Sequence, residues 1–299
     1  MRRALPALCL AIPALLAGCS SAPTADSSKI QIVTAFYPLE FSAESVGGDA
    51  VKVTNLTAPG AEPHDLELSP TQVAAIADAD LVLYVKGFQP AVDDAVAQQA
   101  ADHSLDVSEG LHRLSGVPGE APAAAGTNLD PHIWLDPANI SAIAKGISSR
   151  LSEIDPTDAP KFAANSNALA GDMTKLTADF TQGLAKCRSR TLVTSHDAFA
   201  YLASAFDLTQ VGISGLSPDA EPSPARLADI AALVSDQGIT TIYYEALVSP
   251  KVAETIAAET GAKATMLDPL EGLAAGSNDT YSDVMRRNLS TLIAGQGCT

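Results

Sequence analysis

Basic side chains are scarce in this sequence: 18 lysines and arginines stand against 35 aspartates and glutamates, which gives a formal net charge of −17. Such a chain repels the phosphates of nucleic acid, so we exclude a nucleic-acid partner. The sequence also lacks the H-E-x-x-H, G-x-S-x-G and Walker A patterns, and therefore shows no sign of a zinc protease, a serine hydrolase or a nucleotide-binding loop. With 299 residues, 46% of them hydrophobic, it has the length and composition of a globular protein with two domains.

The amino-terminal segment is expected to lie outside the fold. An apolar run, Leu5–Ala17, follows two arginines and is too short to span a bilayer, which is typical of a signal segment. The next residues, LAGC at 16–19, resemble the lipobox of bacterial lipoproteins, which implies cleavage before Cys19 and lipidation of its thiol. An ordinary signal peptide is the alternative. We expect a lipoprotein signal peptide at 1–18 and a flexible tether of small polar residues at 19–28.

Cysteine is scarce as well, with four in the chain. Cys9 belongs to the signal segment and Cys19 would carry the lipid, which leaves Cys187 and Cys298. Disulfides persist in exported proteins, so we predict that these two cysteines pair, the alternative being two free thiols. Their spacing excludes a zinc site of the CxxC type.

Strand and helix patterns alternate along the chain on both sides of residues 130–137. Leu81–Val85 is a fully apolar strand pattern, typical of a buried parallel sheet, and Thr240–Tyr244 is a strand pattern in the second half. Repeated alternation of strands and helices predicts the α/β class with mainly parallel sheets.

One long helix is predicted between the halves. Apolar residues recur at mostly helical spacing from Thr157 to Cys187. A helix of about 30 residues extends about 45 Å, which is long enough to run along both halves. We therefore expect an N-terminal α/β lobe at 29–156, a linking helix at 157–187 that we take as rigid, and a C-terminal α/β lobe at 188–299.

Three of the five histidines occupy similar positions. His64 and His132 lie in proline-rich loops, His196 follows a predicted strand, and all three stand beside acidic residues. Parallel sheets bind ligands beyond the carboxyl ends of their strands. A single such histidine is more often a surface residue, but imidazole suits zinc and one carboxylate can complete a tetrahedron. Three histidines in matched positions therefore predict a metal site between the halves.

Five segments carry a resemblance to a known family. They are EPHDLELSP at 62–70, DPHIWLDP at 130–137, TSHDAF at 194–199, LVSPKVAE at 247–254 and LDPL at 267–270. In this order, and over nearly all of the mature chain, the sequence resembles the zinc- and manganese-binding solute-binding lipoproteins of ABC transporters, the cluster A-I or ZnuA-like family. The resemblance implies two (β/α) lobes joined by one long helix, with the metal in the cleft between the lobes.

The resemblance also implies a set of metal ligands. Matched motif by motif, these are His64, His132, His196 and Asp268. Manganese-type members carry a glutamate where this chain has His196, and three imidazoles with one carboxylate favour zinc over manganese. Glu245 is a further carboxylate near the expected cleft, with an orienting or structural role and a ligand role as the alternative. Three more acids are candidates for orienting an imidazole through its other ring nitrogen, with loop capping or solvation as the alternative: Asp65, Asp136 and Asp197. Many zinc members have a histidine-rich loop before the second motif, but here Leu111–Asn128 contains only His112, so we expect no zinc-collecting role for it.

The function that the resemblance implies is capture of Zn²⁺ outside the cytoplasm and its delivery to an ABC importer. The partners would be a membrane permease and its ATPase, the lipid anchor would hold the protein at the membrane, and we expect a monomer. The alternatives are a manganese receptor of the same transporter class and a surface adhesin. We do not expect an enzyme, because four protein ligands leave little room for the water that a zinc hydrolase needs.

Overall fold

The computed structural model describes residues 29–116 and 129–299. The predicted signal peptide at 1–18, Cys19, the tether at 19–28 and most of the loop at 111–128 therefore lie outside the described residues. Within the described part of the chain, no helix is both long enough and apolar enough to cross a membrane.

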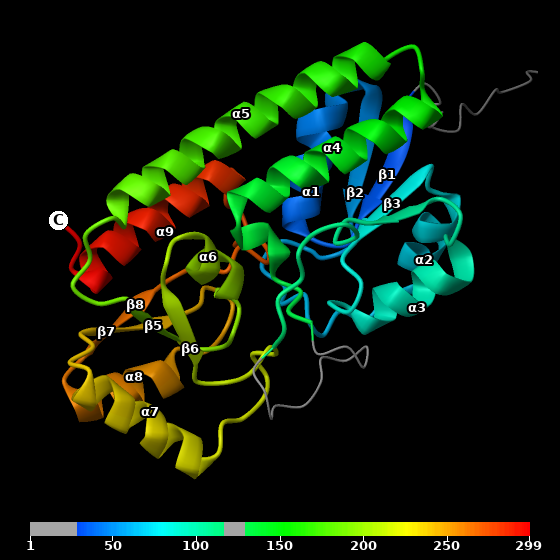
Figure 1. Ribbon diagram of the computed structural model, residues 1–299. Helices are drawn as coiled ribbons and strands as arrows, with labels where there is room; N and C mark the ends of the chain where they lie inside the picture. Colours follow the sequence, from blue (N-terminus) through cyan, green and yellow to red (C-terminus); the bar gives the residue numbers. More distant parts are fainter. Residues whose placement is uncertain (1–28, 117–128) are drawn as a thin grey trace, which may run out of the picture.

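The first half of the chain forms a sheet of four parallel strands in the order β2-β1-β3-β4 (Figure 1). The strands are β1 (Ile30–Thr34), β2 (Val51–Asn55), β3 (Leu81–Tyr84) and β4 (Ser104–Asp106), and the connecting helices are α1 (Tyr37–Gly47), α2 (Pro70–Asp78) and α3 (Pro90–Gln99). The central strands β1 and β3 are almost wholly buried, because helices pack on the sheet, and their buried side chains are mostly apolar. Ser69 caps α2 through a capping box with Gln72.

The second half repeats this topology in the order β6-β5-β7-β8, again with all strands parallel. Its elements are β5 (Thr191–Thr194), α6 (Ala200–Ala205), β6 (Thr209–Gly212), α7 (Pro224–Asp236), β7 (Thr241–Tyr244), α8 (Lys251–Thr260), β8 (Lys263–Met266) and α9 (Tyr281–Gln296). The predicted α/β class with parallel sheets is confirmed. In each sheet the chain first adds a strand on one side and then crosses to the other, so the strand order reverses between β1 and β3 and between β5 and β7.

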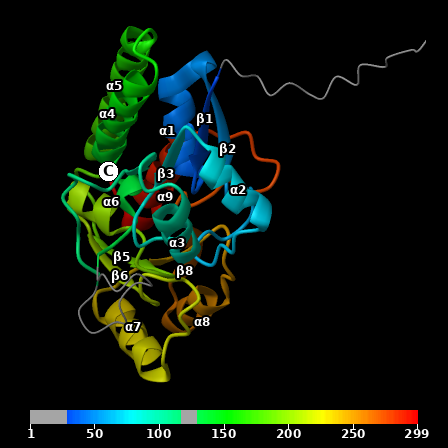
Figure 2. The same ribbon diagram turned by 90° about the vertical axis from the view of Figure 1, so that its right-hand side faces the viewer.

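Two long helices, α4 (Pro137–Ile154) and α5 (Ala159–Gly183), lie side by side along one face of the molecule (Figures 1 and 2). Helix α5 is the predicted long helix, but at 25 residues it is shorter at both ends than 157–187. It begins after Asp158 with Pro160 in its first turn, where the missing N–H breaks no helical bond. It ends early because the chain turns away to pair with the C-terminus. Helix α5 contacts α1 of the first half and α9 of the second, and its rigidity stays a prediction.

The predicted disulfide is confirmed. Cys187 and Cys298 are bonded, and the two residues also form an antiparallel β-bridge. Backbone bonds on either side of the disulfide hold the same two segments together, from Arg188 N to Gln296 O at 3.1 Å and from Thr299 N to Lys186 O at 2.9 Å. The end of α5 is thus fastened to the end of the chain.

The larger hydrophobic core contains side chains from both halves, among them Phe36 of the first half, Leu176 of α5, Leu202 of α6 and Met285 of α9. A smaller core lies between the second sheet and helices α7 and α8. Because one core is shared, the halves cannot move far apart without exposing apolar side chains to water. The shared core therefore holds the loops at the carboxyl ends of the two sheets close to each other.

Candidate metal centre

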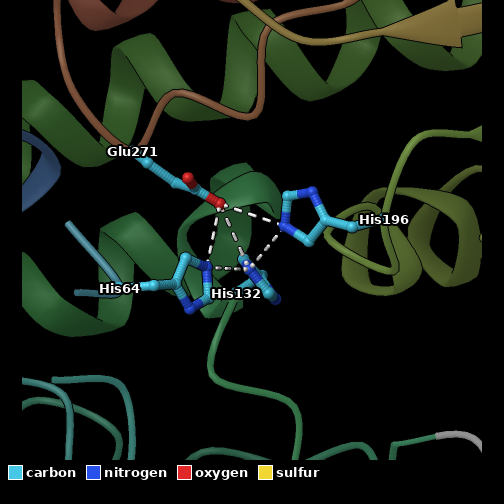
Figure 3. A group of neighbouring side chains, drawn as sticks. All are labelled: His64, His132, His196 and Glu271. Carbon is cyan, nitrogen blue, oxygen red and sulfur yellow. Dashed lines mark hydrogen bonds and ion pairs between the residues drawn. The ribbon is translucent and has the colours of Figure 1, made fainter. Parts of the chain in front are cut away.

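Four side chains from four separate loops converge between the two sheets (Figure 3). His64 comes from the loop between β2 and α2, and His132 stands directly before a 3₁₀ turn, Ile133–Leu135. His196 follows the end of β5, and Glu271 lies in the loop between β8 and α9. His132 and His196 are fully buried, Glu271 is 2% exposed and the His64 side chain is 9% exposed. The three predicted histidines therefore meet as expected.

The contacting atoms lie close together: five of the six distances among them are 3.3–3.4 Å, and all four atoms lie within 4.8 Å of one another. Glu271 Oε1 lies 3.4 Å from His64 Nε2 and 3.3 Å from the Nε2 atoms of both His132 and His196. His132 Nε2 lies 3.4 Å from His64 Nε2 and 3.3 Å from His196 Nε2. Tetrahedral ligand atoms at the Zn–N and Zn–O distance of about 2.0–2.2 Å lie about 3.3–3.6 Å from one another, and the five distances fall within this range.

The chemistry of the four atoms supports the same interpretation. Glu271 Oε1 is buried and has no hydrogen-bond partner among the described residues, although three imidazole nitrogens surround it. A buried carboxylate oxygen without a donor is costly unless a cation neutralises it. A cation between the four atoms would contact all of them.

The carboxylate in this group is Glu271, whereas the sequence prediction was Asp268. Asp268 Oδ1 accepts the backbone N–H of Leu270 at 2.8 Å, and its backbone is held on both sides by the amide side chain of Asn288. The Asp268 carboxylate therefore closes a local turn, as aspartates often do two residues before the amide they bind. Burial raises the pKa of Asp268 to about 6, although the Leu270 N–H opposes this shift.

The turn explains how Glu271 reaches the histidines. Leu270 has a φ of 56°, which lies in the left-handed region that a leucine rarely adopts, and its side chain is fully buried. Such strain, on the order of 1–3 kcal/mol, persists where surrounding structure enforces it, often at functional sites. The sequence prediction missed Glu271 because it took the acid nearest to the strand end. The only available signal was a second carboxylate three residues further along the same loop.

Asp130 orients His132 and was missed by the sequence analysis as a site residue. Its Oδ1 atom lies 2.7 Å from His132 Nδ1 and also accepts the His132 backbone N–H at 2.9 Å. An Nδ1–H donated to this carboxylate leaves the lone pair of Nε2 free to face the centre of the site. Asp130 precedes His132 by two residues in the motif itself, so a local Asx turn was the signal that could have identified it.

Glu245 plays the corresponding part at His196, where we predicted an orienting or structural role. Glu245 Oε1 lies 2.7 Å from His196 Nδ1 and accepts the His196 backbone N–H at 3.2 Å. His196 follows β5 and Glu245 follows β7, which are neighbours in the sheet at the point where the strand order reverses. This is the place where open parallel sheets bind their ligands.

The other three acids have different contacts or neighbours. Asp136 accepts the N–H of Ala138 and caps α4, and Asp197 Oδ1 accepts the N–H of Gly212. Asp65 belongs to a separate, mostly exposed acidic group with Glu62 and Asp219. The structure thus gives Asp136 a capping role and Asp197 a contact with the backbone of β6, and an orienting role for Asp65 stays a prediction.

Buried charges shape the proton affinity of the site. Burial lowers the pKa of His64, only partly opposed by Glu271. Burial also disfavours a charged His196, but Glu245 and Glu271 outweigh it and raise the pKa of His196 well above its ordinary value. Burial raises the pKa of Glu271, yet the three imidazoles overcome this and hold it well below its usual range. A metal ion entering the site therefore replaces protons, and its affinity falls as pH decreases.

Trp134, the only tryptophan of the chain, can report on this exchange. It is fully buried, its ring centroid lies 5.2 Å from that of His132, and its Nε1–H donates to Pro269 O at 2.8 Å. Burial lowers the pKa of His132, but Asp130 and Glu271 outweigh it and raise the pKa, which favours the imidazolium form. An imidazolium beside an indole quenches its emission, and zinc would displace this proton.

We therefore expect Zn²⁺ to increase the Trp134 emission in a titration that saturates at one equivalent, with the short emission wavelength of a buried indole unchanged. The measurement is a fluorescence titration of metal-free protein at neutral pH, with Mg²⁺ as the control ion. Emission that does not respond to the first equivalent of zinc would contradict this account of His132.

The chain is similar to proteins of one known family. The sequence profile of the ZnuA family, described as the zinc-uptake complex component A, periplasmic, matches residues 32–295. The chain belongs to this family. It is 34% identical over 286 residues to the zinc-binding protein AdcA of Streptococcus pyogenes serotype M6, an alignment that covers 88% of this chain and 55% of AdcA. The chain thus spans about half the length of AdcA.

Two further members of the ZnuA family match over most of both chains. The high-affinity zinc uptake system protein ZnuA of Bacillus subtilis is 32% identical over 300 residues, which covers 96% of this chain and 94% of that protein. The solved structure of the Zn(II)-bound ZnuA-like domain of Streptococcus pneumoniae AdcA is 34% identical, has a TM-score of 0.76, and covers 90% of this chain and 99% of that chain. Similarity to these proteins confirms the family that the five sequence motifs indicated.

Proposed function

We propose that this protein captures Zn²⁺ outside the cytoplasm and delivers it to an ABC importer. The observation that carries the proposal is the convergence of Nε2 of His64, His132 and His196 with Glu271 Oε1, in which five of the six distances are 3.3–3.4 Å. These four atoms are the proposed ligands. Membership of the ZnuA family and its similarity to zinc-binding relatives support the same cargo.

The donor set favours zinc over manganese. Manganese suits sites of six oxygen ligands, whereas three imidazole nitrogens and one carboxylate oxygen at tetrahedral positions suit zinc. Three buried carboxylate groups, those of Glu271, Asp130 and Glu245, surround the imidazoles, and a dication offsets negative charge that burial would otherwise make unfavourable. A manganese receptor therefore remains the alternative function, and a direct metal titration tests it.

We also propose that this site is not catalytic. A catalytic zinc keeps one coordination position for water, whereas four protein atoms are available here as ligands. We also propose that a permease and its ATPase receive the zinc, that the protein acts as a monomer, and that lipidated Cys19 and the tether at 19–28 hold it at the outer face of the membrane. The division into lobes at 29–156 and 188–299, joined by the helix predicted at 157–187, belongs to the same proposal.

We expect the metal-stripped protein to bind one equivalent of Zn²⁺ tightly and Mn²⁺ far more weakly in competition titrations. His196→Ala removes one of the four ligands and leaves Glu245 buried without its imidazole partner, so its zinc affinity should fall by more than about 100-fold, beyond the usual effect of losing a group that only orients a ligand. Equal or tighter binding of manganese by the wild type would show that the protein is a manganese receptor instead.

A further inference from the structure

A line of hydrogen bonds connects the ring of His132 to a tyrosine of the second half. Asp130, whose carboxylate contacts His132 Nδ1, is 1% exposed. Hydrogen bonds also hold the backbone of Asp130. The Asp130 N–H donates to Leu114 O at 2.9 Å, and the Asp130 carbonyl accepts the hydroxyl of Tyr201 at 3.1 Å. The position of the carboxylate therefore depends on groups outside the metal site.

Tyr201 makes two bonds through one hydroxyl group. The hydroxyl donates to Asp130 O and accepts the backbone N–H of Leu114 at 2.9 Å, so it joins both strands of the short antiparallel bridge between Ser115 and Leu129. The side chain is 4% exposed, and Arg113 Nη2 makes a longer contact of 3.4 Å with the same Asp130 carbonyl. A buried hydroxyl that both donates and accepts cannot be removed without leaving polar backbone groups unpaired.

Tyr201 links the second half of the chain to Asp130, which belongs to the first half. Tyr201 lies in α6, which begins directly after the motif that contains His196. The segment that supplies one proposed ligand thereby fixes the carboxylate that orients another. We propose that Tyr201 and Asp130 are positioning residues, through which α6 of the second half holds the His132 ring in the orientation that zinc binding requires. This inference rests on the proposed zinc-binding function.

Replacement of Tyr201 tests the inference. Tyr201→Phe should weaken zinc binding by about 3–10-fold, less than the about 10–100-fold that we expect for Asp130→Ala, which removes the group bonded directly to a ligand. Asp130→Asn keeps an acceptor oxygen at the same position and should recover most of the affinity lost in Asp130→Ala. In the Asp130→Ala background, Tyr201→Phe should weaken binding by much less than it does in the wild type, because the two residues act through the same ring.

The readouts are competition titration with zinc and the d–d absorption spectrum of the Co²⁺-loaded protein, which reports ligand geometry. Tyr243→Phe is the matched control, because the buried Tyr243 hydroxyl bonds to Gln296 and not to a residue that holds a ligand. A Tyr201→Phe protein with wild-type zinc affinity and cobalt spectrum would overturn the inference, as would equal weakening by Tyr243→Phe. If the wild type itself bound no zinc tightly, the proposed function would fail, and the inference with it.

Discussion

Glu271→Ala should abolish tight zinc binding, whereas Asp268→Asn should leave it within a few-fold of the wild type. Glu271 Oε1 is the single oxygen among the four converging atoms, at 3.3–3.4 Å from each imidazole nitrogen. Its loss removes both a ligand and the charge that faces the cation, so the fall in affinity should exceed the about 10–100-fold typical of an orienting residue. Competition titration of the metal-stripped variants measures it.

Asp268→Asn is a sharp control because it removes a negative charge from the same loop but keeps the oxygen that accepts the Leu270 N–H. If Asp268 were the ligand, the asparagine variant would lose most of its affinity while Glu271→Ala retained it. That reversed order would restore the assignment made from the sequence and would mean that the loop after β8 rearranges when metal binds.

Removal of the disulfide should cause the largest loss of folding stability. Cys187 and Cys298 are separated by 111 positions, and in the chain-entropy treatment a cross-link that closes a loop of this length stabilises the folded state by about 4–5 kcal/mol. We expect the Cys187→Ala, Cys298→Ala double variant to lose stability of this order in urea unfolding at fixed metal concentration, with the loss visible as a lower midpoint.

Zinc affinity distinguishes this effect from damage to the metal site, because the disulfide lies beyond the C-terminal ends of α5 and α9 and neither cysteine is one of the four converging residues. The double variant should therefore bind zinc like the wild type at temperatures where it is folded. An unchanged urea midpoint would mean that the reduced, unfolded chain already keeps its two segments close, so that the cross-link removes little entropy.

The sequence by itself determined the α/β class, the internal repeat and the three histidines. Apolar runs such as Leu81–Val85 indicate buried parallel strands because every residue of such a strand faces an apolar layer. His64, His132 and His196 could be identified because each stands in a motif at a loop or strand end, where the topology of parallel sheets brings ligands together. The disulfide was also predictable, because only two cysteines remain once the amino-terminal pair is assigned elsewhere.

Local rules could have improved one assignment. Asp136 precedes Pro137 at the start of a helix pattern, and an aspartate followed by proline in this position is a common helix start. The structure shows this capping role, with the Asp136 carboxylate accepting the N–H of Ala138. The histidine motif next to it favoured an orienting role only by proximity in sequence.

Only the tertiary structure decided which carboxylates meet the imidazoles. Asp268 and Glu271 share one loop and one chemistry, and the choice between them depends on the left-handed backbone at Leu270 and on the bonds from Asn288, neither of which has a pattern in the sequence. Glu245 reaches His196 because β5 and β7 are neighbours, although 49 positions separate the two residues. Periodicity and motifs specify local structure and residue chemistry, whereas the convergence of four side chains is a relation between distant loops that the shared core and the two sheets hold in place.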